Sequence, residues 1–304
     1  MKTILATGSE GFVGSYLIEA LEEDYEVVPT SHPLLLPSKE THIPLDIINA
    51  EMTQEVLKTH NPDIVFHLAA LSSVSKSLRD RPLTYSTNIT GTVNLLEAAR
   101  LLNKRVRFVF VSTCEVYGDG GDKIRETNNI TLKSPYAVSK YAAELICQDY
   151  QADIDCVILR PFNHTGPGQA EHFVMPTIAK QIAEIEKGKR PPLIELGNIE
   201  VEREFMNVQD VINAYTLAIE KCKPEEIYNI SSNKGHSVAA ALAIFKKLSK
   251  KDFEIKIDPS KIRKDDIDLL IGNGRKFSRL TKWKPKTPFT KTIEDILNYW
   301  RAKI

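Results

Sequence analysis

The sequence has few cysteines, and they are not arranged as a metal site would require. The four present, Cys114, Cys147, Cys156 and Cys222, form no CxxC pair and have no histidine at the spacing of a zinc ligand. We therefore predict no metal centre. The thiols are expected to stay reduced and to be buried as small apolar side chains.

Net charge and long apolar runs are also missing. Among 304 residues, 40 Lys and Arg balance 40 Asp and Glu, so the formal net charge is zero. A neutral chain lacks the field that attracts nucleic acid or an anionic bilayer. No apolar run approaches the roughly 18 residues that cross a membrane, and the first short apolar segment leads into glycines rather than a signal-peptide pattern. We expect a cytoplasmic protein that binds neither nucleic acid nor membrane.

The first half of the chain alternates short β-branched runs with helical periodicity. This pattern predicts an α/β fold with a Rossmann-like, doubly wound parallel sheet whose ligands bind at the carboxyl ends of the strands. The runs predicted as strands are Thr3–Thr7, Glu26–Thr30, Asp63–Ala69, Arg107–Ser112 and Cys156–Pro161.

The pattern loosens after residue 162, where we predict a smaller α/β substrate lobe. The helix expected at Val208–Cys222 and the strand expected at Ile227–Ile230 are regular enough to rejoin the main sheet. The predicted division is therefore discontinuous. A dinucleotide-binding domain takes 1–162 and about 206–231, and the sugar-nucleotide lobe takes 163–205 and 232–304.

Three glycines stand between the first predicted strand and the first predicted helix. Gly8, Gly11 and Gly14 occur in the run GSEGFVG. In this context glycines permit a tight turn and a close approach of backbone to pyrophosphate, while the helix N-terminus directs N–H groups at the anion. The motif predicts a dinucleotide site.

A tyrosine and a lysine share one face of a later predicted helix. Ser134 is a candidate N-cap and Pro135 fits the first helical position, which places Tyr136 and Lys140 one turn apart. The ammonium is expected to lower the phenol pKa, so that Tyr136 can exchange a proton near neutral pH. Thr113 and Glu115, just after the strand Arg107–Ser112, are expected at the same crevice.

Taken together, these motifs resemble the extended short-chain dehydrogenase/reductase superfamily, in its nucleotide-sugar branch of epimerases, dehydratases and reductases. The resemblance covers essentially the whole chain. It rests on GSEGFVG (8–14), PLDI (44–47), HLAA (67–70), NITGTVNLLEA (88–98), STCEVYG (112–118), SPYAVSK (134–140), RPFNHTGPGQ (160–169), VEREF (201–205) and IRKDDIDLLIG (262–272).

The resemblance implies roles for individual residues. Tyr136, Lys140, Thr113 and Glu115 are implied as catalytic. The implied cofactor contacts are Gly8, Gly11, Phe12, Val13, Gly14, Ser31, Asp46, Ile47, Leu68, Ala69, Ala70, Asn88, Ser112, Tyr136, Lys140, Pro161 and His164. The implied substrate contacts are Thr113, Glu115, Tyr136, Asn163, Val174, Lys180, Arg203, Arg263 and Asp266.

Within the branch, NHTGPGQ and the C-terminal segment are similar to enzymes of GDP-linked 6-deoxy sugars. This similarity implies a GDP-sugar substrate and reduction of the C4 ketone of a GDP-4-keto-6-deoxy-hexose or heptose. The alternatives are a 4,6-dehydratase, in which Glu115 would remove the C5 proton, and a nucleotide-sugar epimerase. Relatives dimerise through two helices per subunit, so a homodimer with a four-helix interface is also implied.

The expected cofactor is NADP(H) rather than NAD(H). NAD enzymes of this fold place Asp or Glu at the end of the second strand, where the carboxylate binds the ribose 2′-OH. This chain has Thr30, Ser31 and His32 there. Without a carboxylate at that position, a 2′-phosphate is not repelled.

Overall fold

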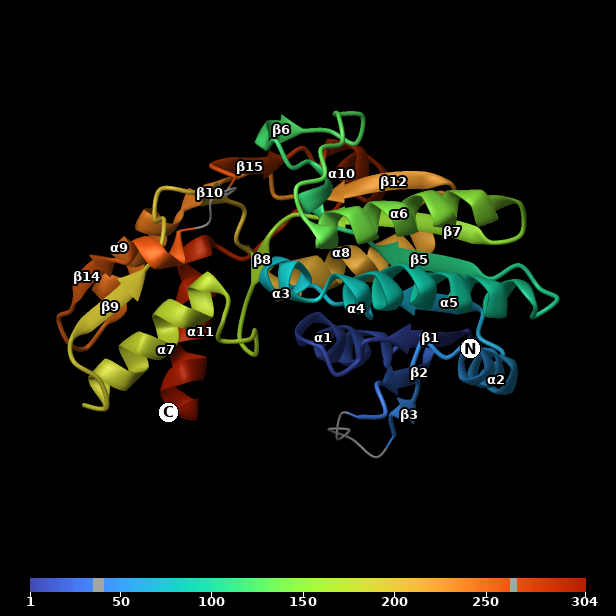
Figure 1. Ribbon diagram of the computed structural model, residues 1–304, viewed down its shortest axis with the longest axis horizontal. Coiled ribbons are helices and arrows are strands. Elements are labelled where there is room, and N and C mark those ends of the chain that lie inside the picture. Colours follow the sequence, from blue (N-terminus) through green and yellow to red (C-terminus); the bar gives the residue numbers. More distant parts are fainter. Residues whose placement is uncertain (35–40, 263–266) are drawn as a thin grey trace.

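A parallel sheet forms the centre of the protein (Figure 1). The computed structural model describes residues 1–34, 41–262 and 267–304. The strand order is β3-β2-β1-β4-β5-β7-β12, and every neighbouring pair is parallel. The strands are β1 (Thr3–Thr7), β2 (Glu26–Ser31), β3 (Ile43–Pro44), β4 (Ile64–His67), β5 (Arg107–Val111), β7 (Asp155–Pro161) and β12 (Glu226–Ile230).

Helices cover both faces of this sheet, which explains why its strands are apolar on both sides. One face packs against α1 (Phe12–Leu21) and α8 (Val208–Lys221), around Leu17, Phe66 and Tyr215. The other face packs against α2 (Ala50–His60), α5 (Gly91–Arg100) and α6 (Pro135–Asp149), around Leu57, Leu95 and Phe108. The predicted doubly wound α/β fold is confirmed.

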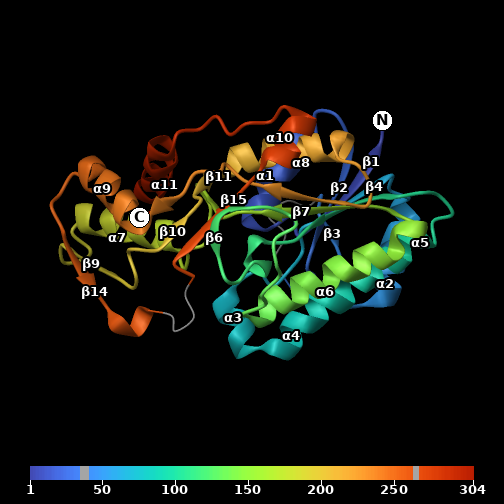
Figure 2. The same ribbon diagram turned by 90° about the horizontal axis from the view of Figure 1, so that it is seen from above.

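A smaller lobe lies beside the sheet (Figure 2). Its helices surround a separate core that includes Ile178, Phe245 and Trp300. The lobe contains α7 (Val174–Glu186), α9 (Val238–Leu248), α11 (Phe289–Lys303) and the parallel pair β9 (Leu193–Leu196) and β14 (Glu254–Ile257).

Short strands connect the two parts. One set has the order β13-β10-β15-β6, and β8 pairs with β11. Their bounds are β6 (Gly121–Ile124), β8 (His164–Thr165), β10 (Glu202–Arg203), β11 (Met206–Asn207), β13 (His236–Ser237) and β15 (Leu269–Gly272). The remaining helices are α3 (Val74–Arg79), α4 (Arg81–Tyr85) and α10 (Arg275–Thr281), with single turns at Ser86–Thr90, Cys114–Val116, Tyr150–Ala152 and Pro259–Lys261.

The predicted strands match the observed ones closely, with one instructive difference. β4 ends at His67, whereas the sequence predicted a strand up to Ala69. The backbone pairing with β1 ends soon after His67. The Ala69 N–H donates at 3.1 Å to the side-chain hydroxyl of Thr7 and not to a backbone carbonyl of β1. Within the described ranges, no helix has the length and apolar character needed to cross a membrane.

Candidate active site

A cavity of about 1330 Å³ opens at the carboxyl ends of the central strands. It runs from the glycine turn after β1, past the ends of β4, β5 and β7, to residues of the smaller lobe such as Val174 and Arg203. This is the edge of a doubly wound sheet at which ligands bind. The cavity is large enough for a dinucleotide and a second ligand side by side.

The glycine turn at one end of the cavity is shaped so that its backbone N–H groups can bind an anion. Gly8 has φ +76°, and a Cβ there would lie 2.7 Å from the backbone nitrogen of Ala69. A Cβ on Gly14 would lie 2.1 Å from the Gly8 carbonyl oxygen. Glycine is therefore required at both positions. The helix α1 starts at Phe12, so Gly14 lies in its first turn. The turn fits a dinucleotide pyrophosphate.

Tyr136 stands in the first turn of α6, where the sequence predicted it. The Ser134 hydroxyl caps the helix by accepting from the Ala137 N–H at 3.1 Å, and Pro135 occupies the first turn. The phenol is hydrogen-bonded to Thr113, and both residues are buried. Burial raises the pKa of Tyr136 well above 10; the bond from Thr113 opposes this, and Glu115 and Cys114 add to it. The phenol is protonated at neutral pH.

Lys140 lies on the same helix face but does not counter that effect. Its side chain is buried, and its ammonium lies 4.2 Å from the centroid of the Phe110 ring. Burial lowers the pKa of Lys140 to about 8, against smaller raising effects of Cys147 and Glu144. The lowering of the Tyr136 pKa that the spacing predicted is therefore not seen in this structure.

A buried ion pair fixes the strand end that carries Thr113. The Arg160 guanidinium on β7 donates to Glu144 on α6 at 2.6 Å and to the Tyr117 hydroxyl at 2.7 Å. The same carboxylate accepts from the Ser112 hydroxyl, directly before Thr113. Burial alone would lower the pKa of Arg160, but Glu144 outweighs it and holds that pKa above its usual range. The pair ties β5, β7 and α6 together behind the site.

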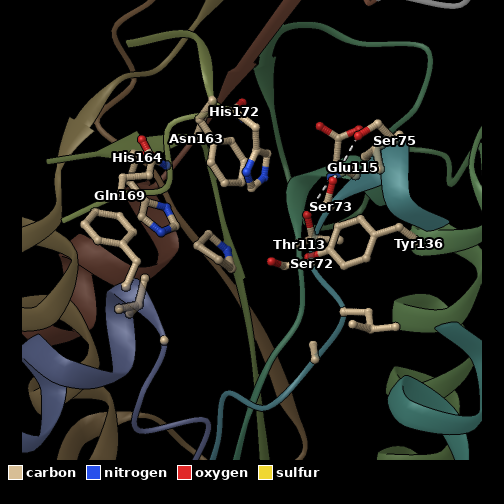
Figure 3. A pocket seen from close by; sticks show the side chains of 18 of the residues that line it. Ser72, Ser73, Ser75, Thr113, Glu115, Tyr136, Asn163, His164, Gln169 and His172 are labelled. Atoms are coloured by element: carbon tan, nitrogen blue, oxygen red, sulfur yellow. Dashed lines mark hydrogen bonds between the residues drawn. The ribbon is translucent and has the colours of Figure 1, made fainter. Parts of the chain in front are cut away.

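Figure 3 shows the side chains around Tyr136. Glu115 lies beside Ser73 and Ser75, at the start of α3. The backbone N–H of Glu115 donates to the Thr113 hydroxyl at 3.1 Å. Across the cavity, the Nδ1–H of His164 donates to the Phe162 carbonyl oxygen (3.0 Å), and the ring stacks on Phe12. Burial lowers the pKa of His164, so its ring is neutral at pH 7.

Most of the residues implied by the resemblance meet at this cavity. Of the cofactor set, all but Asn88 line it, and of the substrate set, Thr113, Glu115, Tyr136, Asn163, Val174 and Arg203 do. Asn88 instead holds the loop after β4, accepting from the Leu71 N–H at 2.8 Å and donating to Ser139 at 2.9 Å. Their roles as ligand contacts stay predictions.

One described residue of the predicted substrate set is not brought to the cavity. Lys180 lies on α7, and its ammonium is bound to Glu171 at 2.6 Å and lies over the Trp300 ring. Arg263 and Asp266 lie outside the described residues.

Several lining residues were not predicted. Ser72, Ser73 and Ser75 follow β4, so their place after a central strand was an available signal. His172 also lines the cavity, and so does Glu10 from within the glycine motif itself.

The fold and the site together define a nicotinamide-dependent enzyme of the extended short-chain dehydrogenase/reductase type. Residues 5–296 match the model of the family described as GDP-mannose 4,6 dehydratase. The chain belongs to this family. Its members are oxidoreductases, dehydratases and epimerases of nucleotide sugars.

Individual relatives are similar over nearly their whole length. The chain is 29% identical to the GDP-6-deoxy-D-mannose reductase of Pseudomonas aeruginosa, over 99% of this chain and 98% of that one. It is 32% identical to the GDP-6-deoxy-D-talose 4-dehydrogenase of Aggregatibacter actinomycetemcomitans, over 90% and 89%. A solved structure of RMD from Pseudomonas aeruginosa complexed with NADPH superposes with a TM-score of 0.90, 28% identity and full coverage of both chains.

Proposed function

We propose that this protein reduces the C4 ketone of a GDP-4-keto-6-deoxy sugar. The observation that carries the proposal is the protonated Tyr136 phenol, hydrogen-bonded to Thr113 in a cavity that reaches from the glycine turn to the smaller lobe. Reduction of a ketone needs a proton donor, and a phenol of raised pKa is in the right form. The two named relatives, one a reductase of a GDP-6-deoxy sugar and the other a 4-dehydrogenase, support this substrate class.

Different groups of the protein bind the cofactor, orient the ketone and donate the proton. The backbone around Gly8 and Gly14 holds the pyrophosphate, and Lys140 binds the ribose next to the nicotinamide. When bound, the nicotinamide supplies the hydride. Thr113 orients the ketone through a hydrogen bond, and Tyr136 gives its proton to the oxygen as charge develops there.

In this proposal the two parts of the chain bind different molecules, one the cofactor and the other the sugar nucleotide. Residues 1–162 and 206–231 hold the cofactor, while residues 163–205 and 232–304 hold the GDP-sugar. The return of β12 to pair with β7 supports this division. The sequence favours NADPH, as does the NADPH in the solved relative, but the position of Glu10, considered below, opposes it.

A second function, 4,6-dehydration of GDP-mannose, is favoured by Glu115. Its carboxylate lies in the cavity close to Thr113 and Tyr136 (Figure 3), where it could remove a proton from C5. Dehydration begins by oxidising C4, for which Tyr136 must accept a proton. A protonated phenol is the form that reduction uses, which is why reduction is proposed first.

Absorbance at 340 nm separates the two functions. One sample contains enzyme, NADH or NADPH, and GDP-4-keto-6-deoxy-mannose made in place by a dehydratase; the other contains GDP-mannose alone. Stoichiometric loss of absorbance in the first sample only is expected for the reductase. A 4-keto product from GDP-mannose without net loss of reduced cofactor would establish the dehydratase instead.

Arg203 is expected to bind a phosphate of the GDP-sugar. It is buried on β10 and lines the cavity from the smaller lobe, and guanidinium binds phosphate through two hydrogen bonds. Arg203→Gln should raise KM for the GDP-sugar about tenfold or more, because a hydrogen bond to a charged group contributes about 1.5–3 kcal/mol. Steady-state kinetics with Arg279→Gln, an exposed arginine outside the cavity, provide the control. An unchanged KM would remove this role.

The pKa of Lys140 predicts how activity depends on pH. The ammonium form holds the ribose, so kcat/KM should fall as pH rises through about 8, where burial places the pKa of Lys140. Tyr136 does not contribute to this fall, because its pKa is held well above 10. A pH profile from 6 to 10 checks the prediction, with Lys140→Met expected to be poorly active throughout. A flat profile between pH 7 and 9 would contradict it.

A further inference from the structure

A carboxylate stands at the end of the cavity that the sequence had assigned to a 2′-phosphate. Glu10 belongs to the glycine turn and lines the cavity together with Thr30, Ser31 and His32 at the end of β2. The turn and the strand are bonded here: the Ser9 N–H donates to the Thr30 carbonyl at 3.2 Å, and the Thr30 N–H donates to the Ser9 hydroxyl at 3.2 Å. Glu10 therefore follows a residue fixed to β2.

The Glu10 side chain contacts a buried imidazole. Its Oε1 lies 2.5 Å from Nδ1 of His42, a residue directly before β3. The Glu10 side chain is only 15% exposed and that of His42 only 4%. Because the imidazole packs against the carboxylate from inside the fold, Glu10 cannot swing away into solvent without losing this contact.

Among the described residues that line this end of the cavity, a second carboxylate lies near Glu10. Asp46 lines the same end of the cavity, with Oδ1 4.0 Å from Nε2 of His32. In the described part of the chain, the lysines and the arginine that line the cavity come from the far side of β4 or from the smaller lobe; they are Lys133, Lys140, Arg203 and Lys261. The end of β2 thus presents two carboxylates and no described ammonium or guanidinium group.

In doubly wound folds the end of the second strand is where the adenosine ribose is read: a carboxylate accepts a hydrogen bond from the 2′-OH, and a cation is needed for a 2′-phosphate. Glu10 reaches this place from the glycine turn instead of the strand. We propose that the Glu10 carboxylate selects NAD(H) over NADP(H). The inference rests on the dinucleotide site alone and holds for either sugar reaction.

Calorimetric titration of the purified full-length protein with NADH and with NADPH tests the proposal without any turnover. The wild-type protein is expected to bind NADH at least about tenfold more tightly, since a hydrogen bond to a charged group and the repulsion of a second anion act in the same direction. Glu10→Gln keeps the size of the side chain and removes its charge. It should reduce the ratio of the two dissociation constants about tenfold, mainly by tighter NADPH binding.

Two further variants distinguish an effect of the Glu10 charge from a general structural effect. Glu19→Gln, an exposed residue of α1 outside the cavity, should bind as the wild type does. His42→Asn keeps the Glu10 carboxylate and should retain the preference for NADH. The proposal is overturned if the wild type binds NADPH as tightly as NADH, if Glu10→Gln leaves the ratio unchanged, or if His42→Asn abolishes the preference. A protein that prefers NADH yet reduces no GDP-keto sugar would refute only the proposed function.

Discussion

Tyr136→Phe is expected to lower kcat about 10²-fold or more, because general acids contribute about 10²–10⁴ to such reactions. The substitution removes one oxygen from a buried ring and leaves the start of α6, capped by Ser134, intact. Loss of the phenol also removes the hydrogen bond to Thr113. The affinity for the nicotinamide cofactor should change little, since Lys140 and the glycine turn remain.

The matched control is Tyr141→Phe, which changes the same group on the same helix outside the cavity. Its kcat should equal that of the wild type in stopped or continuous assays at 340 nm. If Tyr136→Phe turned over at close to the normal rate, Tyr136 would not be the proton donor.

Glu144→Ala is expected to have the largest effect on stability. It would leave the Arg160 guanidinium, which is 2% exposed, without its carboxylate. Removing one partner of a buried ion pair costs about 3–5 kcal/mol, because the remaining charge stays desolvated. Urea denaturation followed by circular dichroism would measure this as a fall in the free energy of unfolding.

An exposed ion pair gives the comparison. Asp295→Ala breaks the 2.6 Å contact with Lys291 on α11, where both side chains are partly in water. Such helical pairs contribute about 0.3–0.5 kcal/mol. A loss of similar size for Glu144→Ala would mean that water reaches Arg160 and that the pair does not fix the site.

The sequence was sufficient for the central fold because its signals are local and repeated. β1, β7 and α6 each combine a run of suitable residues with a clear boundary, such as Ser134 and Pro135 before Tyr136. Two-residue strands such as β8 and β10 carry no detectable period, and they form only because the two parts of the chain meet there.

The candidate site was predictable as a set of residues but not as a set of charges. The spacing of Tyr136 and Lys140 was sufficient to place both on α6. Their pKa values depend mainly on burial, and the spacing of two residues in the sequence does not reveal how deeply they are buried. Likewise, the end of β2 shows no carboxylate in sequence, because Glu10 arrives there from another segment. Lys180 was implied as a substrate contact, but its ammonium is bound to Glu171, in the loop before α7.

The late return of β12 to the sheet bears on how the protein is made. β7 lies between β5 and β12, so its outer edge stays open on the ribosome until residue 230 has emerged. The apolar face of α7 stays uncovered for longer, because α11, which packs against it, follows β12 in the sequence. Open strand edges and bare apolar faces are the surfaces through which unfinished chains associate. The central sheet can therefore be completed once β12 has emerged, whereas the core of the smaller lobe also needs α11.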